Sequence, residues 1–191
     1  MRTTLNDLTE QCIASETISS GGMLTLKCDQ VRLPSGRTGQ REYVVHPGAA
    51  VVVAILPNGQ VLLEKQYRYP LHQVFIELPA GKIDAQEAPL MTAQRELLEE
   101  TGYTAKQWLV LGQQHPCIGY SNEVIHMYLA LDLTSGTHQR DEDEALELFD
   151  LSFADCMRLI KNGQISDGKT MLALFMAEKY LAQHPHLLAA S

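Results

Sequence analysis

The chain has 191 residues and a formal net charge of −8, and 45% of its residues are hydrophobic. This composition is typical of a globular protein with an apolar core, and the length predicts one main domain with at most a small appendage. The acidic balance argues against a nucleic-acid-binding protein, because phosphate backbones are bound by basic surfaces. It does not exclude a small phosphorylated substrate, since a bound cation reverses the local field.

The sequence carries no evident targeting or membrane signal. Residues 1–12 lack the apolar core of a signal peptide, and no run reaches the roughly 18 apolar residues of a membrane span. The four cysteines form no C-x-x-C pair and no zinc-type spacing, so we expect them to be reduced. We therefore expect a cytoplasmic protein that does not contact membranes.

The N-terminal part is predicted to contain a β-hairpin. Residues 23–33 are typical of a strand, the following PSGRTG is a turn broken by Pro and Gly, and residues 41–46 are the returning strand. We expect residues 1–46 to be an N-terminal element of their own and residues 47–191 to be the main domain.

The main domain alternates strand and helix patterns. Residues 49–56 form the β-branched run of a buried strand, and a Pro-Asn-Gly turn leads to a partner strand over residues 60–69. Further strands are predicted over residues 75–80, 108–114 and 124–133, and a polar loop over 134–144 separates them from 145–151. Helices are predicted over residues 88–101, from Ser152 to about 161, and over 168–183. This order predicts an α+β fold, in which a mixed sheet has helices outside it.

The helix over residues 88–101 is predicted to pack on the sheet through an apolar stripe. Leu90, Ala93 and Leu97 share one face, at positions i, i+3 and i+7. Met91 and Leu98 widen that stripe, so we expect all five side chains to face the sheet.

The same helix concentrates like charge on one turn. Glu96, Glu99 and Glu100 lie at i, i+3 and i+4, where like charges repel by about 0.2–0.5 kcal/mol per pair. Two interpretations fit this spacing. In one, Glu96 and Glu100 reach a hard cation such as Mg²⁺, which takes oxygen ligands. In the other, the face is simply solvated, and Arg95 pairs with Glu99 at i+4.

Residues 81–103, GKIDAQEAPLMTAQRELLEETGY, resemble the Nudix box, whose pattern is G-x5-E-x7-R-E-U-x-E-E-x-G-U with U a bulky aliphatic residue. The matching positions are Gly81, Glu87, Arg95, Glu96, Leu97, Glu99, Glu100 and Gly102. Tyr103 places an aromatic residue at the last position, which is a mild departure. The resemblance implies a Nudix fold, an α/β/α sandwich around a mixed sheet. It also implies hydrolysis of a nucleoside diphosphate linked to another group, with Mg²⁺ or Mn²⁺.

The resemblance implies a metal site. Glu96 and Glu100 would be the main ligands, and the backbone carbonyl of Ala80 would be a further one. Glu87 would be a supporting metal ligand or a structural carboxylate. Cations held in this way would screen the repulsion between a pyrophosphate and an attacking hydroxide.

The remaining catalytic roles also come from the resemblance. Glu99 would assist, and Arg95 would orient the glutamates by ion pairing. The segment RDEDEALEL resembles the acidic loop that supplies the catalytic base, and Glu142 matches that position best. Glu144 is the close rival, and it would otherwise contact metal. As an alternative, this loop is simply solvated.

Outside the box the chain resembles the ADP-ribose pyrophosphatase group, through REYVVHPGAAVVVAIL, LLEKQYRYP, ELPAGKID and HPCIGYSNEVIHMYLA. Arg41 and Arg68 are candidates for substrate binding, because Arg recognises phosphate bidentately, although both could be strand-end surface residues. Gly119 and Glu123 stand where related enzymes have a Pro-Gly-Ser/Thr-x-Glu stretch. Pro and Gly are not adjacent here, and Glu123 could instead form a cross-strand ion pair.

The implied reaction is the hydrolysis of ADP-ribose to AMP and ribose 5-phosphate. GDP-mannose or another nucleotide sugar such as ADP-glucose is the alternative substrate. An alternative of another class is a non-catalytic Nudix domain that senses a nucleotide, although such domains usually have a damaged box. The resemblance also implies a homodimer, in which the N-terminal element crosses to a second subunit.

Overall fold

The computed structural model describes residues 7–136 and 145–187. The chain divides into two compact units. The first contains Met1–His46 and the short segment Cys117–Glu123, and the second contains Pro47–Pro116 and Val124–Ser191.

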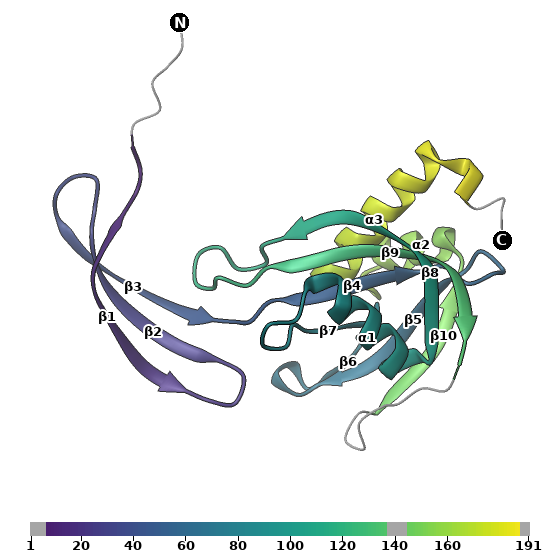
Figure 1. Ribbon diagram of the computed structural model, residues 1–191, viewed down its shortest axis with the longest axis horizontal. Coiled ribbons are helices and arrows are strands. Elements are labelled where there is room, and N and C mark those ends of the chain that lie inside the picture. Colours follow the sequence, from purple (N-terminus) through teal and green to yellow (C-terminus); the bar gives the residue numbers. More distant parts are fainter. Residues whose placement is uncertain (1–6, 137–144, 188–191) are drawn as a thin grey trace, which may run out of the picture. The chain divides into compact units, whose positions relative to one another are not determined.

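The first unit is built on a three-stranded antiparallel sheet in the order β1-β2-β3 (Figure 1). Its strands are β1 (Gln11–Ser20), β2 (Thr25–Arg32) and β3 (Thr38–Val45). The predicted hairpin is confirmed as β2 and β3, but the sequence reasoning missed β1. All ten residues of β1 are exposed, so its sequence lacks the alternation of apolar and polar residues that marks a half-buried strand.

The second unit contains a four-stranded mixed sheet in the order β7-β4-β9-β8. Its strands are β4 (Ala49–Ala54), β7 (Ala80–Lys82), β8 (Tyr103–Gln114) and β9 (Ile125–Ser135). The central pair β4 and β9 is parallel, and the two outer pairs are antiparallel. The predicted strand over residues 75–80 is in fact divided, because β7 leaves the preceding strand and joins this sheet.

A second, antiparallel sheet in the same unit has the order β10-β5-β6. Its strands are β5 (Val61–Arg68), β6 (Gln73–Glu77) and β10 (Leu146–Leu151), with a short 3-10 turn at Tyr69–Leu71 between β5 and β6. The hairpin predicted across the Pro-Asn-Gly turn was wrong, because β4 and β5 belong to different sheets and only an isolated bridge between Ile55 and Val61 joins them. Strand β5 pairs instead with β10 on one side and β6 on the other.

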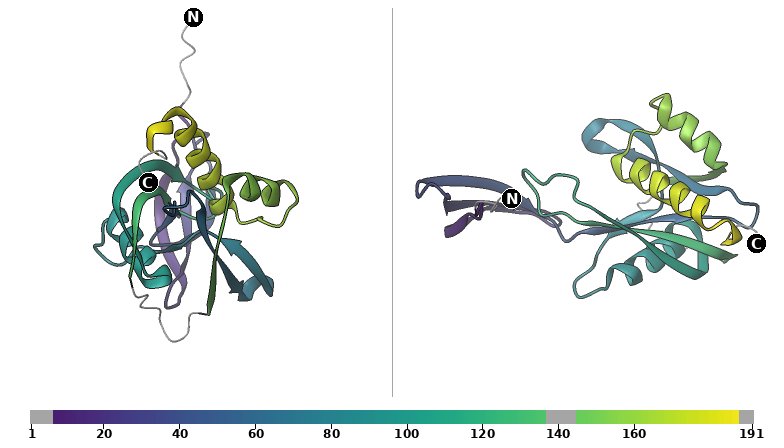
Figure 2. Two further views of the ribbon diagram at one scale, coloured as in Figure 1. Left: turned by 90° about the vertical axis from the view of Figure 1, so that its right-hand side faces the viewer. Right: turned by 90° about the horizontal axis from the view of Figure 1, so that it is seen from above.

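Helices cover both faces of the mixed sheet, as Figure 2 shows. They are α1 (Pro89–Thr101), α2 (Phe153–Lys161) and α3 (Gly168–Gln183), and a 3-10 turn at Pro185–Leu187 follows. Among the described residues, none of these helices has both the length and the apolar character needed to cross a membrane.

The side chains of β4 separate the two cores. Ala50, Val52 and Ala54 pack with α1, whereas Val51 and Val53 pack in the cluster that contains α2 and α3. This alternation follows from the two-residue period of a strand, and burial on both faces explains why β4 is apolar throughout. The layers form the α/β/α sandwich of the Nudix fold, as predicted.

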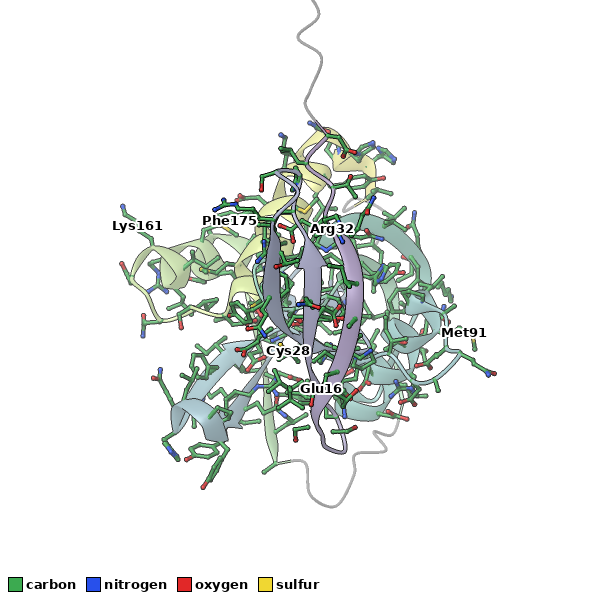
Figure 3. All side chains as sticks on the ribbon, turned by 90° about the vertical axis from the view of Figure 1, so that its left-hand side faces the viewer. Glu16, Cys28, Arg32, Met91, Lys161 and Phe175 are labelled. Atoms are coloured by element: carbon green, nitrogen blue, oxygen red, sulfur yellow. The ribbon has the colours of Figure 1, made fainter. Side chains whose placement is uncertain are left out.

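The predicted apolar stripe of α1 was partly wrong. Ala93 and Leu97 are buried against the sheet, but Leu90 is 37% and Met91 60% exposed, and Met91 projects outward in Figure 3. Glu96 and Glu100 are buried instead. The helix is rotated about its axis relative to the predicted orientation, because these two carboxylates face strand β7.

Candidate active site

The Nudix box forms a strand, a loop and a helix whose ends meet. Gly81 lies in β7 and pairs with Ala50 of β4. The loop then leads to Pro89, a residue well suited to the first turn of a helix because it needs no N–H partner. Helix α1 ends at Gly102, whose φ of 77° suits glycine and whose N–H bonds to the carbonyl of Leu98. The helix therefore lies against the strand that begins the box.

Two carboxylates of α1 converge on residues 80 and 81. Glu100 accepts a hydrogen bond from the backbone N–H of Ala80 through Oε2 at 3.1 Å. Glu96 lies so close to Gly81 that a Cβ on residue 81 would be 1.9 Å from Glu96 Oε1. Both glutamates are nearly buried, with exposed fractions of 9% and 2%. Glu96 and Glu100, one helical turn apart, thus both approach the backbone of Ala80 and Gly81.

Arg95 holds the acidic cluster together. Its Nη1 donates to Glu96 at 2.7 Å and to Glu99 at 3.0 Å. On its other side, Nε and Nη2 donate to Glu87 at 3.1 and 3.0 Å, and Nη2 also bonds the carbonyl of Lys82. The hydrogen bonds to Glu87, the charge of Glu96 and the hydrogen bond to Glu99 outweigh burial and raise the pKa of Arg95 above its ordinary value. Repulsion on this helical turn is therefore offset by one permanent cation.

Both carboxylate oxygens of Glu87 accept hydrogen bonds from residues of the box. Besides Arg95, its Oε2 accepts hydrogen bonds from Thr92 Oγ1 at 2.8 Å and from the N–H of Asp84 at 3.3 Å. The Arg95 hydrogen bonds, assisted by Thr92, outweigh burial and lower the pKa of Glu87 to about 2. Of the two roles considered for Glu87, this environment favours the structural carboxylate over the metal ligand.

The donors at this site fit a hard divalent cation. Mg²⁺ prefers oxygen ligands and usually binds through one or two carboxylates, together with water and substrate phosphates. Glu96 and Glu100 could supply the carboxylates, and the carbonyl of Ala80 lies on the same stretch of backbone as the atoms that they approach. No group of three His, Cys, Asp or Glu side chains with metal-binding geometry occurs within residues 7–136 and 145–187.

Arg68 lies at the end of β5 in a second charged cluster. Its Nε and Nη2 donate to the two oxygens of Glu77, each at 2.7 Å. Glu77 is 2% exposed, whereas the Arg68 side chain is 41% exposed and keeps Nη1 outside this pair. Arg68 is thus fixed in direction by Glu77 while its side chain stays partly exposed, which makes it a candidate for binding a phosphate.

Lys169 completes this cluster from the first turn of α3. Its Nζ contacts Glu77 and also bonds Asp167 at 2.9 Å. Burial would raise the pKa of Glu77, but hydrogen bonds from Arg68 and the charge of Lys169 outweigh it and lower the pKa. The sequence reasoning missed Glu77 and Lys169. An acid inside the apolar run FIELPA was the available signal, because a buried charge needs a partner.

The remaining substrate candidates belong to the first unit. Arg41 pairs with Glu10 and donates to the carbonyl of Gln40 at 2.8 Å. Glu123 Oε1 lies 3.5 Å from His46 Nδ1, a contact that is an ion pair only when the histidine is protonated. Gly119 lies in the 117–123 loop, and a Cβ there would meet no atom within 4 Å.

Glu142 and Glu144, the two candidates for the catalytic base, lie outside the described residues. The site described above therefore consists of Ala80, Glu87, Arg95, Glu96, Glu99 and Glu100, with Arg68 in the same unit.

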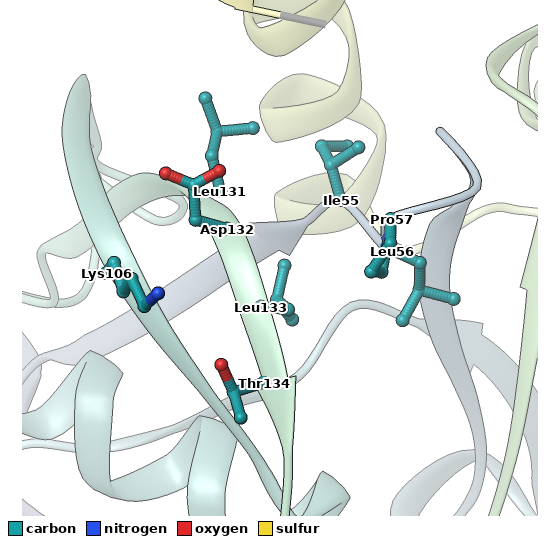
Figure 4. Close-up of a pocket in the computed structure, with 8 residues that line it drawn as sticks. All are labelled: Ile55, Leu56, Pro57, Lys106, Leu131, Asp132, Leu133 and Thr134. Atoms are coloured by element: carbon teal, nitrogen blue, oxygen red, sulfur yellow. The ribbon is translucent and has the colours of Figure 1, made fainter. Parts of the chain in front are cut away.

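A pocket of about 370 Å³ occurs elsewhere in the second unit (Figure 4). It lies where β4 ends beside β9, and Lys106 and Asp132 approach it from the neighbouring strands β8 and β9. None of the residues that line it belongs to the Nudix box. It is therefore separate from the glutamate cluster and is not the candidate active site.

Together, the sandwich fold and the Arg95-centred glutamates of α1 define a Nudix hydrolase. A family model, the NUDIX domain, matches residues 45–174, and the chain belongs to this family.

Curated relatives cover most of the chain. It is 38% identical over 172 residues to an ADP-ribose pyrophosphatase of Bacillus subtilis (strain 168), a match that covers 89% of this chain and 93% of the relative. It is 41% identical over 169 residues to a methanol dehydrogenase activator of Bacillus methanolicus, covering 86% and 90%. A more distant relative, 32% identical over 140 residues, is a GDP-mannose pyrophosphatase of Yersinia enterocolitica, covering 69% and 73%.

Among solved structures, an ADP compounds hydrolase superposes with a TM-score of 0.83. The match covers 92% of this chain and 95% of the solved chain at 22% sequence identity, so it shows a shared fold.

Proposed function

We propose that this Nudix hydrolase cleaves ADP-ribose to AMP and ribose 5-phosphate, with Mg²⁺ as its cation and Mn²⁺ as a substitute. The observation that carries the proposal is the convergence of the Glu96 and Glu100 carboxylates on Ala80 and Gly81. The similarity over 89% of the chain to an enzyme named ADP-ribose pyrophosphatase supports this choice of substrate.

In the proposed site, Glu96, Glu100 and the carbonyl of Ala80 hold the cation. A bound divalent cation supplies charge neutralisation for the pyrophosphate and lowers the pKa of water. Arg95 keeps Glu96 and Glu99 in place by the hydrogen bonds described above, so the carboxylates are preorganised. Glu87 fixes Arg95 from the other side, which is a structural role.

The proposed hydrolysis needs a base and a phosphate clamp. Water oxygen forms a bond to phosphorus, the bridging P–O bond breaks, and Glu142 accepts the proton. Glu144 is the rival for this role. Arg68, held in direction by Glu77, binds a phosphate oxygen through its exposed side. We assign further substrate contacts to Arg41, Gly119 and Glu123.

We also propose that the chain forms a homodimer through its first unit. Several apolar side chains of this unit are exposed, which is typical of interaction surfaces. They are Leu8, Ile13, Ile18, Met23, Leu24 and Leu26. Light scattering that gives a dimer mass would support this proposal, and a monomer mass at working concentration would refute it. The cytoplasmic location is part of the proposal, supported by four free cysteines.

The substrate is tested by turnover of ADP-ribose, GDP-mannose and ADP-glucose, each with Mg²⁺ and with a chelator. We expect the highest kcat/KM for ADP-ribose, with AMP as product and no turnover with chelator. Preferential release of GMP from GDP-mannose would keep the chemistry and change the substrate. Failure to hydrolyse any nucleoside diphosphate, together with tight nucleotide binding, would favour the sensing domain.

A second candidate function rests on the 41% identity to the relative named methanol dehydrogenase activator. In this case the chain would raise the activity of a methanol dehydrogenase. The test is a methanol dehydrogenase assay with the wild-type chain and with Glu100→Gln. Activation by the wild type alone would mean that activation needs the hydrolase site, and no effect of either would remove this candidate.

A further inference from the structure

The first turn of α3 makes a buried hydrogen bond to the segment that precedes the Nudix box. The backbone N–H of Leu78 donates to Thr170 Oγ1 at 3.0 Å, and both residues are fully buried. The N–H of Thr170 is itself capped by Asp167 Oδ2 at 3.0 Å. A buried N–H without an acceptor is rare and unfavourable, so the position of Leu78 depends on this hydroxyl.

Leu78, which donates the hydrogen bond to Thr170, is two residues before the proposed metal ligand Ala80. The carbonyl of Pro79 accepts a hydrogen bond from Val52 of β4 at 2.9 Å, and the N–H of Ala80 donates to Glu100 of α1 at 3.1 Å. Three consecutive residues are thus held by α3, β4 and α1 in turn. The φ angle of Pro79 is fixed by its ring, which leaves fewer backbone rotations between Leu78 and Ala80 to absorb a displacement of Leu78.

Lys169, next to Thr170 in α3, interacts with Glu77, next to Leu78 in the segment before the box. Lys169 contacts the buried carboxylate of Glu77, which also orients Arg68. The first turn of α3 therefore holds residues 77 and 78 together, one through a charge and one through a hydroxyl.

We propose that Thr170 is a positioning residue for the divalent cation. Through the N–H of Leu78 it sets the place of the Ala80 peptide, and through the Ala80 N–H it sets the Glu100 carboxylate. The inference rests on the proposed metal site and extends it to α3, a helix that lies outside the Nudix box.

Two substitutions separate this role from simple packing. Thr170→Val keeps the branched shape and removes the oxygen, whereas Thr170→Ser keeps the oxygen and removes a methyl group. We expect Thr170→Val to weaken Mn²⁺ binding by about tenfold, the size typical when the support of a metal ligand is lost. We expect Thr170→Ser to bind Mn²⁺ like the wild type and to have a lower Tm.

Mn²⁺ affinity is measured by electron paramagnetic resonance of the free ion, and Tm by circular dichroism, on the full chain. A packing role alone predicts that both variants lower Tm and leave Mn²⁺ affinity unchanged, which would overturn the inference. If Thr170→Val does not fold, Thr170→Cys replaces it, because sulfur is a weak acceptor. Weak Mn²⁺ binding by Thr170→Ser would also overturn it, since the oxygen is retained.

Two controls complete the experiment. Ser152→Ala removes the cap of α2, where Ser152 Oγ accepts the N–H of Asp155, without touching residues 77–80. It should lower Tm and keep Mn²⁺ affinity. Glu100→Gln should weaken Mn²⁺ binding. Wild-type affinity in Glu100→Gln would refute the proposed metal site, whereas its loss there combined with wild-type affinity in Thr170→Val would refute only the role of α3.

Discussion

The carboxylate of Glu96 occupies the space that any side chain at position 81 would need. A Cβ on Gly81 would lie 1.9 Å from Glu96 Oε1 and 2.0 Å from its carboxyl carbon, far inside normal contact. Gly81 therefore lets a helix carboxylate lie directly on the backbone of strand β7. The first glycine of the box and its central glutamate form one unit, although 15 positions separate them in the sequence.

Replacement of Gly81 by alanine should displace Glu96 and abolish most activity. A shift of about 1 Å at a catalytic group can lower the rate by about 100-fold, and we expect a loss of at least this size in kcat/KM for ADP-ribose. Circular dichroism checks that Gly81→Ala is folded. Gly22→Ala is the matched control, because a Cβ there meets no atom within 4 Å, and it should keep wild-type activity. Full activity in Gly81→Ala would contradict the described position of Glu96.

Substitution of Arg95 by lysine should uncouple the acidic cluster. Lysine keeps the charge but cannot reach Glu87, Glu96 and Glu99 together, because it lacks the planar fork of guanidinium. We expect kcat/KM to fall by about 10–100-fold, the range typical of residues that support metal ligands. Arg158→Lys, in an exposed pair with Asp155, is the control and should be neutral. Equal kinetics for the two variants would show that Arg95 contributes only charge.

Acid should weaken the cluster around Glu77. Because the folded-state pKa of Glu77 is lowered, its contribution to stability is present above the usual value of 4.5 and is lost as pH falls through the folded-state pKa. At pH 7, Glu77→Gln should lower the free energy of unfolding by about 1.5–3 kcal/mol, the size of hydrogen bonds to charged groups. Urea unfolding of both proteins should give a constant difference above about pH 5 and a shrinking one below pH 4.5. A difference that grows in acid would contradict the lowered pKa.

The proposed base can be assigned by two matched variants at positions two residues apart in the sequence. Glu142→Gln should remove turnover of ADP-ribose while Mn²⁺ affinity stays at the wild-type value, because a base is needed for proton transfer and not for cation binding. Glu144→Gln should retain measurable turnover. The opposite pattern, with Glu144→Gln inactive and Glu142→Gln active, would transfer the role to Glu144.

Local sequence signals predicted the helices well. Ser152 caps α2 as expected, and α3 spans the predicted residues 168–183, because caps and apolar periodicity are properties of neighbouring residues. The strand β1 was missed, since all of its residues are exposed and its apolar residues, such as Ile13 and Ile18, do not alternate regularly with polar ones. The orientation of α1 was also not predictable from its apolar residues. Glu96 and Glu100 face the interior because they contact Gly81 and Ala80 of β7, which no pattern within α1 indicates.

In the candidate site too, residues of a continuous motif could be predicted, whereas contacts between distant residues could not. The Nudix box identified the glutamates and Arg95 from a continuous motif. The contacts of Leu78 with Thr170 and of Glu77 with Lys169 join residues 92 positions apart, and no local pattern indicates them. Partners of this kind become visible only when the folded chain brings α3 beside the end of β6.

The most direct test of the account is AMP release from ADP-ribose by the wild type and by Glu100→Gln over a range of Mg²⁺ concentrations. We predict Mg²⁺-dependent formation of AMP and ribose 5-phosphate by the wild type. Loss of most of this turnover is predicted in a folded Glu100→Gln variant. Wild-type rates in Glu100→Gln, or AMP release that persists with chelator, would contradict a cation site built on the glutamates of α1.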